Sequence, residues 1–186
     1  MSAVFLSASF PQPERAAAFP PSDPAALADA VTAVARGVLG RDAQLVSCGH
    51  PTITPLLLYV AAEFGWRERL VVYQSERFRA VVPEETWRLG REGYGDLRFT
   101  PSVGALADDL ERMRREALTS ADYRGAVFIG GMEGIVDEYE LFGELHPHAH
   151  RFALAGPGGA AAQLPDHTGS RRYPVVALEI VRALGL

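Results

Sequence analysis

The sequence predicts an α/β fold of three layers, in which helices flank both faces of a mostly parallel sheet. Apolar segments typical of strands alternate with segments of helical spacing along all 186 residues. The strand segments are continuous apolar runs, which is typical of parallel strands covered on both faces. Two of these runs end at glycine turns that lead directly into helices. We therefore expect a single domain over residues 1–186 that binds a ligand at the carboxyl edge of the sheet.

The first half of the chain begins with an expected buried strand at Ala3–Ser9 and an irregular loop over residues 10–24 that contains five prolines. Asp23 and Pro24 then predict a helix start, because aspartate is a favoured N-cap and proline suits the first helical position. Gly40 ends that helix. The next expected elements are a strand at residues 44–48, a helix at 52–64 and a strand at 69–74.

The second half continues the alternation of strands and helices. Ser102 is expected to cap a charged amphipathic helix that runs to Leu118. The other expected elements are helices at residues 83–91, 135–145 and 174–184 and strands at 96–99, 126–129 and 151–155.

The composition excludes several classes of protein. No apolar run approaches the ~20 residues that a membrane helix needs, and no secretory signal begins the chain, so we expect a cytoplasmic protein without a membrane partner. A net charge of −5 argues against a nucleic-acid partner. All 18 basic residues are arginine, which excludes a Schiff-base lysine and the lysine of a P-loop. The single cysteine, Cys48, excludes an intramolecular disulfide and a cysteine-rich zinc site.

The two glycine turns predict the binding site. A helix that starts directly after a strand presents free backbone N–H groups, and its dipole attracts anions. One turn follows Cys48 at Gly49, and the other follows Ile129 at Gly130 and Gly131. We expect these two strands to lie side by side, so that their ends face a common crevice of phosphate or ribose character.

The segment from Leu110 to Glu138 combines an arginine-bearing helix, an apolar strand and the turn Gly-Gly-Met-Glu-Gly. It resembles the Lonely Guy (LOG) proteins, whose motif is such a helix and strand followed by Pro-Gly-Gly-x-Gly-Thr-x-x-Glu. The run Ser47–Thr54 lies where these proteins have their first glycine turn, and Phe5–Ser9 is similar to their first strand. The resemblance extends over nearly the whole chain. It points to the wider SLOG superfamily of Rossmann-like domains, which bind nucleotides or nucleotide-derived signals.

The resemblance implies a set of site residues. LOG enzymes hydrolyse the N-glycosidic bond of cytokinin riboside monophosphates, and Glu138 and Arg114 match their catalytic glutamate and arginine. Because the turn is one residue longer here, Asp137 competes with Glu138 for the acidic role. The nucleotide-binding residues are then expected to be Ser7, Ser9, Gly49, His50, Thr52, Thr54, Gly130, Gly131, Glu133, Gly134 and Ile135.

Departures from the LOG motif leave the function open. Glu133 stands inside the expected anion site, where a carboxylate repels phosphate and suits sugar hydroxyls instead. The leading hypothesis is a protein that binds a nucleotide or a nucleotide-derived molecule and needs no cofactor. The alternatives are an N-glycosidic hydrolase or transferase that uses Glu138 and Arg114, and a non-catalytic interaction protein.

The resemblance also implies at least a homodimer, with the helix at residues 102–118 as the expected contact. No metal site is expected. His146, His148 and His150 alternate along the chain and would share a face if extended, but a polar loop explains them better.

Overall fold

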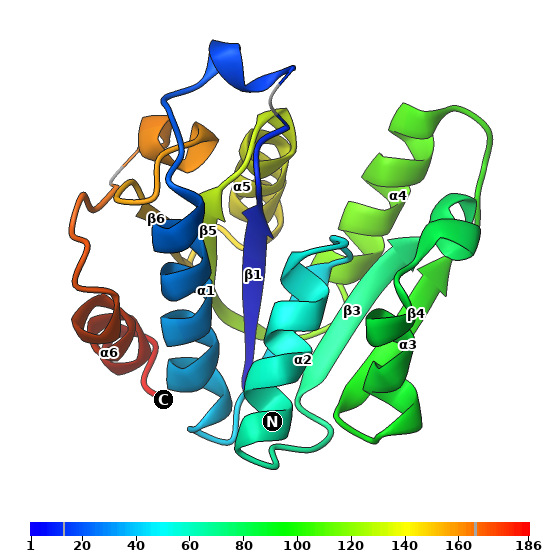
Figure 1. Cartoon of the computed structure of the whole chain (residues 1–186), viewed down its shortest axis with the longest axis horizontal. Coiled ribbons are helices and arrows are strands. Elements are labelled where there is room, and N and C mark those ends of the chain that lie inside the picture. The colour runs from blue at the N-terminus through cyan, green and yellow to red at the C-terminus, as the bar shows by residue number, and fades with distance from the viewer. Residues whose placement is uncertain (13, 166) are drawn as a thin grey trace.

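The computed structural model describes residues 1–12, 14–165 and 167–186, and these residues form an α/β fold of three layers (Figure 1). The described strands build one six-stranded sheet in the order β4-β3-β2-β1-β5-β6. Every pairing between neighbouring strands of this sheet is parallel. The predicted fold class is therefore confirmed.

The elements follow the predicted alternation. The strands are β1 (Ala3–Ser9), β2 (Gln44–Cys48), β3 (Leu70–Ser75), β4 (Gly95–Thr100), β5 (Tyr123–Gly130) and β6 (His150–Leu154). The helices are α1 (Pro24–Leu39), α2 (Ile53–Glu63), α3 (Glu84–Arg91), α4 (Leu106–Leu118), α5 (Glu133–Leu145) and α6 (Tyr173–Ala183). Three short 3₁₀ turns complete the described elements, namely η1 (Ala16–Ala18), η2 (Glu76–Val81) and η3 (Ala160–Gln163).

Each strand contributes side chains to both faces of the sheet, because successive side chains of a strand point to opposite sides. In β1, Val4 and Leu6 belong to one buried cluster, whereas Ala3 and Phe5 belong to the other. The first cluster packs under α1, α2, α3 and α6, and the second packs under α4 and α5. This burial on both sides explains why the strand sequences are continuously apolar.

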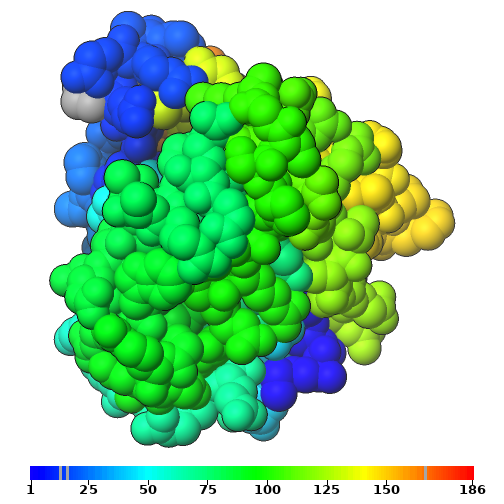
Figure 2. Space-filling view, turned by 90° about the vertical axis from the view of Figure 1, so that its right-hand side faces the viewer, coloured from blue at the N-terminus to red at the C-terminus, as the bar shows by residue number. Residues whose placement is uncertain are grey.

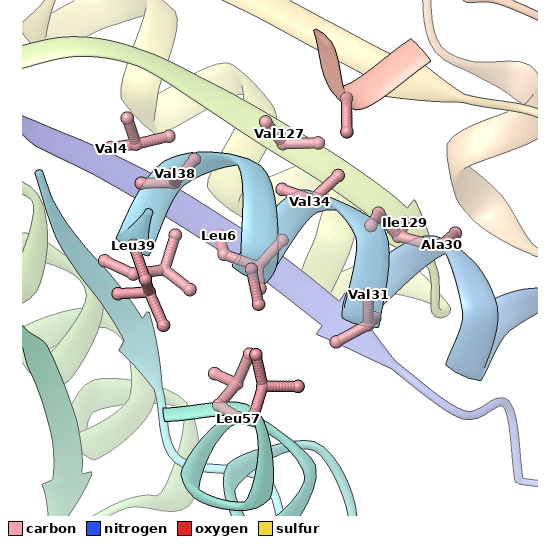
Figure 3. Close-up of a cluster of buried hydrophobic side chains, with 14 of the residues drawn as sticks. Val4, Leu6, Ala30, Val31, Val34, Val38, Leu39, Leu57, Val127 and Ile129 are labelled. Carbon is pink, nitrogen blue, oxygen red and sulfur yellow. The ribbon is translucent and has the colours of Figure 1, made fainter. Parts of the chain in front are cut away.

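The helix α1 lies across the centre of the first face. Figure 3 shows its side chains Val31, Val34 and Val38 directed toward β1 and β5, where Leu6 and Val127 lie. The valines on α1 are 0–1% exposed. This close packing fixes α1 against the two strands whose carboxyl ends carry the candidate site.

Two predicted helix caps have opposite outcomes. Asp23 caps α1 as predicted, since its carboxylate accepts hydrogen bonds from the backbone N–H groups of Ala25 and Ala26 at 3.1 Å each. Ser102 does not cap α4, because the helix begins at Leu106 with Ala105 as its N-cap. The Ser102 hydroxyl instead donates to the Asp109 carboxylate at 2.7 Å.

The expected loop over residues 10–24 contains the turn η1, and its residue 13 lies outside the described residues. Across the described part of the chain, none of the helices combines the length and apolarity needed to span a bilayer.

Candidate functional site

The carboxyl ends of the central strands place the two glycine turns on either side of β1. The expectation that the strands ending at Cys48 and Ile129 are neighbours is wrong, because β1 pairs with both of them and separates them. The sheet order reverses between β1 and β5, since the chain adds β2 to β4 on one side of β1 and β5 on the other. Parallel sheets bind ligands beyond such a reversal.

A cavity of about 460 Å³ lies beyond these strand ends. Its volume is within the range of ~300–1,000 Å³ that is usual for small-molecule sites. Gly49 and Met132 both line it, so the two glycine turns do reach one crevice across β1. An open crevice at this place is what a ligand-binding protein requires.

The cavity has two chemically different ends. The polar end, on the side of β1 and β5, is lined by Ser9, Arg15, Arg114, Glu133 and Gly134, together with the apolar residues Phe10 and Met132. The apolar end, on the side of β3 and β4, is lined by Phe78, Val81, Val82, Pro83, Thr86 and Leu97. The segment from η2 to α4, green in Figure 2, covers this edge of the molecule, and the N-terminal loop (blue) lies above it. The cavity therefore suits a ligand with one polar and one apolar part.

The first glycine turn is closed by His50. The Nδ1 atom of His50 accepts hydrogen bonds from the backbone N–H groups of Thr52 at 3.2 Å and Ile53 at 3.4 Å. The expectation of free N–H groups at this helix end is therefore wrong for these two residues. Burial lowers the pKa of His50 to about 4, so the ring is neutral and the proton resides on Nε2.

Only some of the residues expected at this turn line the cavity. Gly49, His50 and Thr54 line it, whereas Thr52 is exposed and lies outside its lining. The Thr54 hydroxyl accepts a hydrogen bond from the His50 backbone N–H at 3.2 Å. This side of the cavity is thus a neutral surface rather than an anion site.

The second glycine turn is shaped by residues that do not line the cavity. Gly130 and Gly131 have φ angles of +67° and +70°, which suit glycine. A Cβ atom on Gly131 would overlap the side chain of Ile135, which is 3% exposed and lies over the turn. Of the residues expected here, Glu133 and Gly134 line the cavity, and Gly130, Gly131 and Ile135 shape the backbone beneath them.

Glu138, Ser7 and Arg114 meet at the base of the polar end. The Ser7 hydroxyl donates a hydrogen bond of 2.5 Å to one carboxylate oxygen of Glu138, and the Arg114 Nε atom lies 3.5 Å from the other. Arg114 also donates to Asp137 at 2.9 Å. Asp137 and Glu138 therefore share one guanidinium. Glu138 is the buried member of the pair, with 8% exposure.

Burial sets the protonation of this cluster. It raises the pKa of Glu138 above its usual value, although the Ser7 hydrogen bond and the Arg114 charge act in the opposite direction. Burial, together with the neighbouring Glu138, also raises the pKa of the Cys48 thiol well above its usual value. Cys48 therefore stays protonated, which does not suit a nucleophile.

An ion pair lies at the mouth of the polar end. Arg15, in the N-terminal loop, donates a hydrogen bond of 2.6 Å to Glu133 at the start of α5. Both side chains are slightly more than half exposed, so the pair contributes little to stability and a ligand can replace either partner. Arg15 offsets only part of the carboxylate charge that the sequence places in this turn, because both side chains are more than half exposed.

The apolar end was missed by sequence reasoning, and so was the residue that anchors it. The Asp109 carboxylate, fully buried in α4, accepts hydrogen bonds from Arg77 at 2.5 Å, Ser102 at 2.7 Å and the Val103 backbone at 2.5 Å. Arg77 precedes Phe78 in η2, so this network fixes the turn that carries the apolar lining. The sequence does hold a signal for this residue, because Asp109 lies on the same buried face of α4 as Met113 and Ala117.

The three alternating histidines do not converge. His146 bonds to the Leu118 carbonyl oxygen at 2.7 Å, and His150 stacks against Phe152. Among the described residues, no group of three or more His, Cys, Asp or Glu side chains is arranged to hold a metal ion.

Comparisons with known proteins agree with the fold. The sequence model of the SLOG cluster3 family matches residues 19–178. A search of curated proteins finds no match. Among solved structures, the chain is similar to the X-ray structure of TM1055, a structural genomics target, with a TM-score of 0.61. The two are 14% identical over 97% of this chain and 99% of that chain, so the likeness shows the fold alone.

Proposed function

Because the chain belongs to the SLOG cluster3 family, we propose that it binds a nucleotide or a nucleotide-derived small molecule at the carboxyl edge of its sheet. The observation that carries this proposal is the cavity of about 460 Å³ at the point where the strand order reverses. An apolar end beside a polar end with two arginines and one carboxylate matches a molecule made of a flat base and a sugar.

Thermal-shift screening followed by calorimetry tests this proposal. The panel contains nucleosides, nucleoside monophosphates, ADP-ribose forms and cyclic nucleotides. A ligand present at a hundred times its Kd stabilises the fold by about 2.7 kcal/mol, which for a domain of this size raises Tm by about 5–10 °C. A folded sample that responds to no member of the panel would contradict the proposal.

A matched pair of variants ties binding to the cavity. Val82→Trp fills the apolar end and should abolish the thermal shift, because Val82 lines the cavity. Val175→Trp places the same side chain on α6, where Val175 is 39% exposed, and should leave the shift unchanged. Equal binding by both variants would place the ligand elsewhere.

A second candidate is hydrolysis of an N-glycosidic bond, and the cluster of Ser7, Glu138 and Arg114 favours it. A carboxylate beside the sugar would stabilise the positive charge that develops during bond cleavage, and an arginine would hold the leaving group. Arg114 lines the cavity, whereas Glu138 lies behind it with 8% exposure. Turnover would therefore require Arg114 to move aside.

Release of free base from nucleoside monophosphates distinguishes the two candidates. If Glu138 acts in cleavage, Glu138→Gln should lower turnover by about 100-fold or more while ligand binding persists. Binding without base release by the wild type would favour a sensor. Unchanged turnover in Glu138→Gln would exclude the proposed chemistry.

The third candidate, an interaction protein with structural glycine turns, predicts a crevice filled by side chains, and the open cavity argues against it.

We also propose a homodimer through α4. Val103 precedes this helix and Leu106 begins it, and both apolar side chains, which are 51% and 50% exposed, are available to be buried in such a contact. Light scattering of the wild type and of Leu106→Asp tests this, since the variant should be monomeric.

A further inference from the structure

One wall of the cavity is formed by Gly49, His50 and Gln74, where β2 and β3 end beside each other. All three residues are partly exposed. We call them the middle wall, because β2 and β3 lie between β1, on the polar side of the cavity, and β4, on the apolar side. The backbone fixes which hydrogen-bonding groups this wall offers to a ligand.

The side-chain amide of Gln74 has one possible orientation. Its Oε1 atom accepts a hydrogen bond from the Ser75 backbone N–H at 2.9 Å, and a backbone N–H can only donate, so the facing atom is the oxygen. The Nε2 atom lies against Gly49, since a Cβ atom on Gly49 would be 2.7 Å from it. Nε2 carries two hydrogens, and among the described residues it makes one long hydrogen bond, of 3.4 Å to the Gly49 carbonyl oxygen. One N–H donor of Gln74 is therefore left over.

The ring of His50 is fixed in the same way. Two backbone N–H groups at the start of α2 donate to Nδ1, so the hydrogen of the neutral ring resides on Nε2. Within the described part of the chain Nε2 has no hydrogen-bond partner, and it is open to solvent rather than buried. The pKa of about 4 keeps the ring neutral at physiological pH. His50 therefore offers an uncharged N–H donor.

The acceptors of the middle wall are already occupied. The His50 carbonyl oxygen accepts the Thr54 backbone N–H at 3.1 Å. The Thr54 hydroxyl accepts the His50 backbone N–H at 3.2 Å and belongs to a residue that is 1% exposed. The Gly49 carbonyl oxygen, Gln74 Oε1 and His50 Nδ1 each receive a hydrogen bond as well. The groups left for a ligand are thus neutral N–H donors.

We propose that the middle wall selects a base that presents oxygen acceptors, so that the protein binds nucleosides of the oxo bases hypoxanthine or uracil in preference to those of the amino bases adenine and cytosine. An exocyclic oxygen accepts from these donors, whereas an amino group leaves them unpaired. The adjoining apolar residues Phe78 and Leu97 hold the face of the base. This inference rests on the proposed function and adds the class of base.

Two matched pairs of nucleosides test this selection in the wild type. Inosine and adenosine carry the same ribose and differ in an oxo or an amino group on the purine, and uridine and cytidine differ in the same way on the pyrimidine. In the pair that binds more tightly, calorimetry should give about tenfold higher affinity for the oxo member, because the amino member leaves a donor of the wall unpaired.

Substitutions then assign the preference to the two donors. Gln74→Met keeps the length of the side chain and removes its N–H groups. His50→Ser keeps a capping acceptor for α2 and removes the ring N–H. Each should lower the ratio of oxo to amino affinity by about threefold or more. Gln44→Met, at the opposite end of β2, should leave the ratio unchanged. A merely structural role would lower both affinities together and preserve the ratio.

The contrary results are distinguishable. If the two members of each pair bind equally, or if the amino nucleosides bind more tightly, the inference is overturned while the proposed function stands. If the ratio is the same in the wild type, Gln74→Met and His50→Ser, other groups set the preference and the inference is also overturned. If the folded wild type binds no nucleoside or nucleotide, the proposed function fails, and the inference fails with it.

Discussion

The Ser7 hydroxyl in β1 donates a hydrogen bond of 2.5 Å to the Glu138 carboxylate in α5, although 131 positions separate the two residues in the sequence. The bond joins the central strand to the helix that follows the second glycine turn. It holds a buried carboxylate directly behind Arg114, the arginine that lines the cavity. The geometry of the polar end therefore depends on a contact inside the fold.

Removal of this hydroxyl should destabilise the protein at neutral pH. Ser7→Ala leaves Glu138 buried without its strongest donor, and the free energy of unfolding should fall by about 1–3 kcal/mol. The loss should shrink as the pH falls, because a protonated Glu138 needs the donor less. Urea unfolding at several pH values measures both effects. Ser9→Ala, in the same strand, is the matched control, and an equal loss there would refute the assignment.

The Asp109 network should control both stability and ligand binding. Asp109→Asn removes the charge that holds Arg77, so η2 and the apolar end should loosen, with lower Tm and weaker binding of any ligand found in the screen. Asp108→Asn changes the neighbouring exposed residue in the same way and should have little effect. Chemical unfolding and calorimetry on both variants test this, and similar behaviour of the two would contradict it.

The pH dependence of this network has a defined sign. Hydrogen bonds from Ser102 and Val103, and then from Arg77, lower the pKa of Asp109 to about 2. The unfolded state therefore takes up a proton at a higher pH than the folded state does. The stabilisation is complete above the ordinary pKa of 3.8 and disappears as the pH falls toward 2. Asp109→Asn should abolish that part of the acid-unfolding curve.

His50 should make the protein sensitive to mild acid. Its ordinary pKa of 6.5 falls to about 4 in the folded state because the ring is buried. Between these pH values the unfolded state binds a proton that the folded state excludes, so stability falls as the pH is lowered through this range. His50→Asn retains an acceptor for the start of α2 but cannot titrate, and should be insensitive there. If the stability of the wild type and that of His50→Asn fall equally as the pH is lowered, another group titrates in this range.

The sheet was predictable because its strands are buried on both faces and therefore carry continuous apolar runs, as in the β5 segment from Ala126 to Ile129. The start of α1 was predictable for a local reason, since an aspartate before a proline satisfies the free N–H groups of a helix without any tertiary contact. The same rule failed at Ser102, whose hydroxyl bonds to the buried Asp109 instead. The capping rule considers only the first helical turn, so it does not include an acceptor seven residues further along the chain.

The candidate site was predictable only in part, because some of its residues follow local sequence patterns and others come together only in the folded structure. The glycine turns in the sequence indicate where the chain leaves the sheet. Gly49, Glu133 and Gly134, which belong to these turns, do line the cavity. The side chain of His50 occupies the N–H groups of α2, and this depends on a rotamer that no spacing reveals. The apolar end comes from η2, α3 and β4, which carry no motif and meet the turns only in the folded structure.

Gly134 should be required for the position of Arg114. A Cβ atom on Gly134 would lie 2.9 Å from a terminal nitrogen of Arg114. Gly134→Ala should therefore displace the guanidinium from Asp137 and weaken ligand binding several-fold, with little loss of stability because alanine favours a helix. Gly169→Ala is the control, since its Cβ would meet nothing within 4 Å. A crystal structure of Gly134→Ala with Arg114 unmoved would contradict this account.

Glu133 should make the polar end select a ribose over a phosphate. Its carboxylate lies at the start of α5, and its partner Arg15 is more than half exposed and incompletely screens it. A phosphate placed there meets a negative charge at close range, which in partly hydrated surroundings costs about 1–4 kcal/mol. The wild type should therefore bind adenosine at least about fivefold more tightly than its 5′-monophosphate.

Replacement of this one charge should reduce the preference for the nucleoside. Glu133→Gln keeps the size and hydrogen-bonding capacity of the side chain, so the affinity for adenosine should change little while that for the monophosphate increases. Glu140→Gln removes an equal charge from an exposed position on the same helix and should leave the ratio of the two affinities unchanged. Calorimetry at low and high salt completes the test, because salt screens charge repulsion and should shift the wild-type ratio in the same direction as Glu133→Gln. A wild type that prefers the monophosphate, or a ratio that neither salt nor Glu133→Gln alters, would mean that the phosphate binds away from α5.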